Sequence, residues 1–128
     1  MRFGLKEKFD AKKDREKQEL QKPEFKFDAK YCGGHKAYPI RKEIKAKFSV
    51  FAERMEIVSD RFLLTVRFDQ VTTVENLNQN KIYTIIQYHD GVDVQSPIFD
   101  FGKYLEKKQP IIYQKVIAAR LKKDGNST

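Results

Sequence analysis

Cys32 and His35 stand three residues apart, which is the spacing of half a metal site. Thiolate and imidazole are both zinc ligands, but a zinc site in a protein takes four ligands. The chain has one cysteine and two histidines, and the second histidine, His89, lies far along the sequence. We therefore expect no metal at this pair, and instead a turn that holds a small, half-buried thiol.

Two other patterns are candidates for chemistry. The run Gly33-Gly34-His35-Lys36 is glycine-rich, but it lacks the Gly-Lys-Ser/Thr ending and the following helix of a phosphate-binding loop. His89 and Asp90 are a candidate acid–base pair, because imidazole titrates near neutral pH. They stand in a solvated turn, and no nucleophile occurs in a frame such as Gly-x-Ser-x-Gly. The sequence thus predicts no catalytic residue, no cofactor and a protein that is not an enzyme.

A basic cluster is the strongest functional candidate, and it consists of Lys36, Arg41, Lys42, Lys45 and Lys47. Side chains of an extended chain alternate between two faces, so Lys45 and Lys47 share one face, with Arg41 and Lys42 just before them. Such a cluster attracts phosphate-rich surfaces in a salt-dependent way. Lysines on an outer strand also discourage edge-to-edge pairing of sheets, and the sequence leaves both interpretations open.

Length and composition limit what these residues can belong to. A chain of 128 residues fits one domain, and its ten Phe and six Tyr can fill a core. The net charge of +8 is unevenly spread, because residues 60–101 carry three basic and six acidic side chains while both flanks are basic. A basic flank suits lipid phosphates, nucleic acid or an acidic protein, although it also serves solubility alone.

The sequence also predicts where the protein resides. No apolar run approaches the ~20 residues of a transmembrane helix. The first residues lack the apolar region of a secretory signal, and one cysteine excludes an intrachain disulfide. We expect a cytoplasmic protein, at most peripheral at a membrane.

Alternation of apolar and polar residues predicts short strands through the middle of the chain. Apolar residues take every second position in the clearest strand: Ile44, Ala46, Phe48, Val50 and Ala52. Further strands are expected over residues 54–59, 62–68, 71–77, 81–88 and 92–101. Asp90-Gly91 is a hairpin signal, and Pro97 predicts a bulge or an edge position. Residues 31–40 are expected as extended chain with a Gly-Gly turn, and residues 76–80 as a turn.

After Phe101 the apolar period becomes that of a helix, whose buried face is expected to hold Leu105, Ile112, Val116 and Ala119. Asp100 is the expected N-cap. Pro110 removes a backbone hydrogen bond, which predicts a kink or a new helix start at that residue. We expect Ile112 and Val116 to close the open end of a bent sheet.

The predicted organisation is one domain over residues 25–122. Residues 1–24 are expected to be a charged appendage, helical or disordered, because their few apolar residues form no continuous stripe and Pro23 ends any helix. Residues 123–128 are expected to fray.

Several stretches carry a resemblance to a known family: Tyr31-Cys32-Gly33-Gly34-His35, residues 68–75, residues 83–91 and Phe99-Asp100-Phe101-Gly102-Lys103. Over residues 31–120 the chain resembles the pleckstrin-homology-like (PH-like) superfold, especially short bacterial and archaeal PH-like domains and GRAM domains. The resemblance implies a mainly β fold: a strongly bent antiparallel sheet of six to seven strands, capped by one C-terminal amphipathic helix. It also implies a binding or adaptor role, with oligomerisation in some members.

The resemblance also bears on ligands. Lys45-Ala46-Lys47 has alternating bases but no Arg in either place of the family's phosphoinositide pattern, which implies unspecific contact with acidic lipid and no specific inositol-phosphate pocket. We expect a non-catalytic domain that contacts anionic lipid head groups or an acidic protein through its basic strand face. A scaffold that binds only protein or itself is the alternative. Nucleic acid ranks below both, because Phe48, Phe62 and Phe68 are predicted to face the core.

Overall fold

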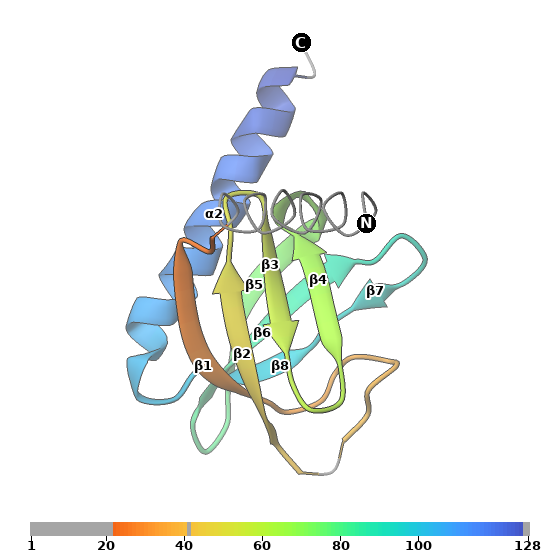
Figure 1. The fold of residues 1–128 in the computed structure, drawn as a ribbon, viewed down its shortest axis with the longest axis vertical. Coiled ribbons are helices and arrows are strands. Elements are labelled where there is room, and N and C mark those ends of the chain that lie inside the picture. Colours follow the sequence, from red (N-terminus) through yellow and green to blue (C-terminus); the bar gives the residue numbers. More distant parts are fainter. Residues whose placement is uncertain (1–21, 41, 127–128) are drawn as a thin grey trace, which may run out of the picture.

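One antiparallel sheet curls around the hydrophobic core, and a long helix covers the inside of the curl (Figure 1). The computed structural model describes residues 22–40 and 42–126. Its strands are β1 (Phe25–Tyr31), β2 (Ile44–Val50), β3 (Arg54–Val58), β4 (Leu63–Arg67), β5 (Val71–Asn78), β6 (Ile82–His89), β7 (Val94–Gln95) and β8 (Ile98–Asp100). Two 3₁₀ turns, η1 (Phe68–Gln70) and η2 (Gly102–Tyr104), precede β5 and the helix α2 (Leu105–Asn126).

The strands follow the order β4-β3-β2-β1-β8-β6-β5, and the two-residue β7 pairs with β6 outside this path. In Figure 1, β1 to β4 form the near layer of the curl, while β5, β6 and β8 lie behind them. The described residues therefore form a half-barrel of seven strands in one path, capped by the C-terminal helix. The predicted mainly β architecture with one terminal helix is confirmed.

The alternation that predicted the central strands matches their burial. On β2, Ala46, Phe48 and Val50 are buried, while Lys45 and Lys47 are exposed. The inward residues of the next two strands are also buried: Met55 and Ile57 on β3, and Leu64 and Val66 on β4. Each inward row meets its neighbour in register, so the core side of three strands is continuous.

Three strand boundaries differ from the prediction. The first strand covers Phe25–Tyr31, and of residues 31–40, expected to be extended with a Gly-Gly turn, only Tyr31 lies in a strand. Residues 32–40 and 42–43 form a loop, called loop 32–43 here, of which residue 41 lies outside the described residues. β5 continues through residues 76–78, which were expected as a turn, because Asn78 pairs with Ile82 of β6. The single strand expected over 92–101 is broken between β7 and β8, where Pro97 has no N–H to donate.

The helix matches its predicted face. Ile112 and Val116 are buried, and Leu105 and Ala119 pack against the same core. The helix begins before Pro110, so the alternative of a new start at that residue is wrong. It continues to Asn126, through part of the segment expected to fray, while residues 1–21 of the expected appendage lie outside the described residues.

Two polar side chains near the helix differ from expectation. Asp100 does not cap α2; its Oδ1 accepts the N–H of Gly102 at 2.9 Å, at the start of η2. Lys115, which is not among the residues predicted for the buried face, is nevertheless only 22 % exposed and forms an ion pair with Glu24. The backbone N–H of Glu24 also bonds the carbonyl of Val50, so the chain joins the sheet beside the helix.

Loop 32–43 covers the core at the Ile44 end of β2, away from the Val50 end where Lys115 and Glu24 meet. The Tyr38 and Phe62 rings lie 4.9 Å apart, and Phe62 lies 4.9 Å from buried Tyr31. Gly34 fixes the path of the loop, because its φ is +93° and its α-carbon lies against the carbonyl of Ser96. Two backbone hydrogen bonds join the loop to Ile98: the N–H of Cys32 donates to the carbonyl of Ile98, and the N–H of Ile98 donates to the carbonyl of Gly33.

The first stability prediction tests the helix. Ile112 is fully buried, so truncating it to Ala should lower the free energy of unfolding by about 2–4 kcal/mol. Lys107→Ala, on the exposed side, should change it by less than about 0.5 kcal/mol. Urea denaturation of the two variants measures the difference, and an unchanged midpoint for Ile112→Ala would show that α2 does not close the core.

The second stability prediction tests the loop. A methyl group at position 34 would overlap the Ser96 carbonyl, whereas at Gly91, which has φ +101°, it would meet nothing within 4 Å. Gly91→Ala should therefore cost only the left-handed backbone, about 1–2 kcal/mol. Gly34→Ala should cost about 1–3 kcal/mol more, because the loop must move away from β7 and β8. Equal melting temperatures for the two variants would contradict this close approach.

Candidate functional site

Lys45 and Lys47 lie where the sequence placed them, on the solvent side of β2. In the sheet register Lys45 is opposite Lys30 of β1, and Lys47 is opposite Asp28. Among residues 22–40 and 42–126, neither lysine has a carboxylate oxygen within 4 Å of its Nζ. Within the part of the chain that the structure describes, both ammonium groups are thus left without a carboxylate partner.

The other three predicted residues have different surroundings. Lys36 stands in loop 32–43, where its Nζ lies 3.5 Å from a carboxylate oxygen of Asp93 and its N–H bonds Gln95. It therefore helps to join this loop to the β6–β7 hairpin. Lys42 is exposed beside a shallow pocket near the start of β2. Arg41 lies outside the described residues.

Sequence reasoning missed four neighbours of Lys45 and Lys47. Lys26 and Lys30 are exposed on β1, a strand that was not recognised. Val58 and Leu63 are exposed on β3 and β4, and the register places Val58 opposite both Lys47 and Leu63. We call the solvent side of β1 to β4 the outer face; besides exposed Asp28, Thr65 and Arg67 it carries six exposed basic or apolar side chains: Lys26, Lys30, Lys45, Lys47, Val58 and Leu63. Solvent-side alternation on β1 was the one signal that would have revealed its lysines.

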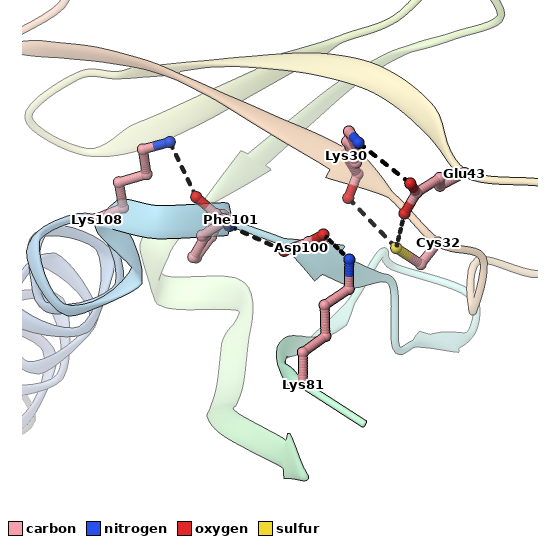
Figure 2. Close-up of polar contacts among 8 residues, drawn as sticks. Lys30, Cys32, Glu43, Lys81, Asp100, Phe101 and Lys108 are labelled. Carbon is pink, nitrogen blue, oxygen red and sulfur yellow. Dashed lines mark hydrogen bonds and ion pairs between the residues drawn. The ribbon is translucent and has the colours of Figure 1, made fainter. Parts of the chain in front are cut away.

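Cys32, the first residue of the pair that has the spacing of half a metal site, lies between two ion pairs (Figure 2). Lys30 Nζ is 3.2 Å from Glu43, and Lys81 Nζ is 2.6 Å from Asp100. The thiol contacts the backbone oxygen of Lys30 at 3.7 Å and Glu43 at 4.0 Å. Burial, followed by the Glu43 and Asp100 charges, raises the pKa of the Cys32 thiol. The group therefore stays protonated at neutral pH and is a poor nucleophile.

Asp100 is the most enclosed carboxylate of this cluster. Burial pulls the pKa of Asp100 upward, but the hydrogen bonds from Lys81 and from the N–H of Gly102 outweigh it and leave that pKa below its ordinary value. The same contact raises the pKa of Lys81. This pair fastens β8 to the start of β6, and its charges are satisfied within the protein.

His35, the second half of that pair, is buried in the loop. Its Nδ1 accepts the backbone N–H of Ala37 at 3.1 Å, and the backbone N–H of His35 donates to the Tyr31 hydroxyl. Its ring lies 5.0 Å from the Tyr38 ring and 6.3 Å from the Tyr88 ring. Burial lowers the pKa of His35, although the Asp90 charge acts in the opposite direction. The geometry gives His35 a structural role in holding the loop.

His89 and Asp90 are likewise used by their own turn. Asp90 accepts the N–H groups of Val92 and Asp93 at 2.8 and 2.7 Å, and the amide of Gln95 at 2.9 Å. These bonds, led by the one from Asp93, lower the pKa of Asp90 to about 2. His89 Nδ1 accepts the N–H of Gly91 at 3.0 Å. The pair that suggested acid–base chemistry therefore stabilises the β6–β7 turn.

A groove of about 530 Å³ lies between α2, the β2–β3 turn and η1. Its floor includes Ala52, Ala118 and Ala119, and its rim is charged. Most of the rim charges are already paired: Lys122 with Glu53, Arg67 with Asp69, and Lys115 with Glu24. The groove thus offers less free charge to a ligand than the outer face does.

The pH dependence of stability tests the role of His35. Because its pKa is lowered in the folded state, the fold favours neutral imidazole, and protonation opposes folding. The stability that neutral His35 contributes is complete above the ordinary histidine pKa of about 6.5 and is lost as the pH falls below it. Urea midpoints of the wild type should therefore fall between pH 7.5 and 5, and should fall less for His35→Gln. An equal fall of the urea midpoint with pH in the wild type and in His35→Gln would contradict this role.

Comparison with known proteins adds no assignment. No protein-family model matches the chain, and no curated protein matches it. Within the described residues, no three His, Cys, Asp or Glu side chains gather in a way that would hold a metal ion. Of the helices among residues 22–40 and 42–126, none combines the length and the apolar composition that crossing a bilayer requires. Function must be argued from the outer face itself.

Proposed function

We propose that this chain is a non-catalytic, PH-like binding domain whose outer face contacts anionic membrane surfaces. The observation that carries the proposal is the pair Lys45 and Lys47: both are exposed, both are on one strand, and neither is neutralised by a described carboxylate. Lys26 and Lys30 extend the positive charge onto β1.

The size of the attraction suits reversible attachment. A basic residue close to an anionic bilayer contributes about 1 kcal/mol, and the attraction fades within a Debye length of ~8 Å at physiological salt. Lys45 and Lys47 together would thus contribute about 2 kcal/mol, with smaller additions from Lys26 and from Lys30, which is shared with Glu43. The four lysines stand on the solvent side of two paired strands, so they can approach a surface together.

The protonation and accessibility of the three candidate catalytic side chains support a binding role over a catalytic one. The thiol of Cys32 is kept protonated, and the imidazole of His35 is enclosed by aromatic rings. Asp90 is occupied by three hydrogen bonds within its own turn. Catalysis needs a nucleophile or a base with access to substrate, and these three groups lack either activation or access.

Vesicle co-sedimentation tests the proposal. The protein should bind phosphatidylserine-containing vesicles but not phosphatidylcholine vesicles, and binding should weaken as salt rises. Lys45→Gln with Lys47→Gln should weaken binding by about 2 kcal/mol, or roughly 30-fold. Lys103→Gln with Lys107→Gln removes the same charge from exposed residues of η2 and α2 and should leave binding within about threefold, because neither residue belongs to the strands of the outer face.

Two results would contradict the proposal. Binding that ignores vesicle charge, or no binding at all, would exclude an electrostatic membrane role and favour a protein partner. Equal losses in the two double variants would show that total charge matters and the outer face does not.

A further inference from the structure

Two exposed apolar side chains continue the row of the outer face that contains Lys47. Val58 is 46 % exposed and Leu63 is 60 % exposed, and the two are partners across β3 and β4. Val58 is also the partner of Lys47 across β2 and β3. One row of the sheet therefore places a cation next to two apolar side chains, on the same solvent side.

Packing of the core does not explain why Val58 and Leu63 are apolar. Inward positions of β3 and β4 hold Met55, Ile57 and Val66, which are almost fully buried and pack the inside of the curl. Val58 and Leu63 occupy the opposite side of the pleat, where a polar residue such as Thr65 would serve equally well. Apolar side chains adjoining a cationic cluster are typical of a surface that meets both lipid phosphates and the acyl boundary.

We propose that the outer face lies against an anionic bilayer with Val58 and Leu63 inserted between the head groups, while Lys45 and Lys47 contact the phosphates. This inference rests on the proposed function and adds the orientation of the domain and a second source of affinity. Stable attachment to a membrane generally needs two signals, and a few lysines supply only one. The apolar pair supplies the other.

A second copy of the chain is a poorer occupant of this surface. A twofold interface places the same patch of each copy against itself. Lys45 and Lys47 would then face their own counterparts, with Asp28 as the one acidic neighbour in the same row. A lipid surface complements both the charge and the apolar pair, whereas a second copy complements only the apolar pair.

A single-tryptophan experiment tests the orientation, because the chain has no Trp. Leu63→Trp places the reporter on the outer face, and Leu121→Trp is the matched control on α2, where Leu121 is 67 % exposed. α2 packs on the inner side of the sheet, so Leu121 should stay in water. With phosphatidylserine vesicles that contain brominated lipid, Leu63→Trp emission should shift to the blue and lose at least half its intensity, while Leu121→Trp should change by less than a tenth.

The salt response gives a second readout. Salt screens the attraction between the lysines and the lipid phosphates, but apolar insertion does not depend on ionic strength. The wild type should therefore keep part of its vesicle binding at 0.5 M salt. Val58→Ser with Leu63→Ser should bind about tenfold more weakly there, while retaining charge-dependent binding at low salt. Because both positions are exposed, the melting temperature should remain close to that of the wild type.

The outcomes separate this inference from the proposed function. Vesicle binding with no quenching of Leu63→Trp, or with quenching of Leu121→Trp instead, overturns the orientation and leaves charge-dependent binding standing. A blue shift of Leu63→Trp without vesicles that grows with protein concentration assigns the face to a second copy and overturns the inference. Absence of vesicle binding by the wild type overturns both.

Discussion

Phe48 is the side chain on which the rest of the structure depends. It is fully buried at the middle of β2, and its ring contacts Phe27 of β1 at 5.2 Å and Phe99 of β8 at 4.8 Å. It also meets Phe101, just before the helix, at 5.3 Å. One residue thereby joins the front layer of the curl, the back layer and the helix start. Because successive side chains of a strand point to opposite faces, an inward Phe48 requires an outward Lys47.

This coupling means that core and surface are specified by the same alternation. A one-residue slip of β2 would bury its lysines and expose Phe48, so the register is held by the full hydrophobic cost of that exchange. The apolar pair of the outer face follows from the same register, since Val58 meets Lys47 only while Phe48 meets Ile57. The candidate binding surface is therefore as rigid as the core that lies behind it. Loop 32–43 and α2 close the core at different ends of β2, and neither of them covers the solvent side of β1 to β4.

The sequence predicted those parts of the fold that local pattern determines. Alternation on β2, β3 and β4 and the helical spacing of Ile112 and Val116 located the core, and the same alternation placed Lys45 and Lys47 outside. β1 was not predicted because exposed Phe25 and small Ala29 weaken its alternation of apolar and polar residues. The ion pair of Lys36 with Asp93 joins residues far apart in the chain, and no local pattern encodes such a contact. The adjacency of Val58 and Leu63 to Lys47 likewise depends on strand pairing, which a single sequence leaves undetermined.

The uneven charge along the sequence corresponds to an uneven distribution of charge over the folded protein. Much of the acidic middle of the sequence lies on β5 to β8, where several carboxylates bind partners within the protein. Asp90 orders its hairpin, Asp100 holds Lys81, and Asp93 meets Lys36. The basic side chains of β1 and β2 gain fewer such partners, since Lys30 is paired with Glu43 while Lys45 and Lys47 have no carboxylate within 4 Å among the described residues. Internal neutralisation on one half of the curl thus concentrates uncompensated positive charge on the other half, and such a separation orients a molecule as it approaches an anionic surface.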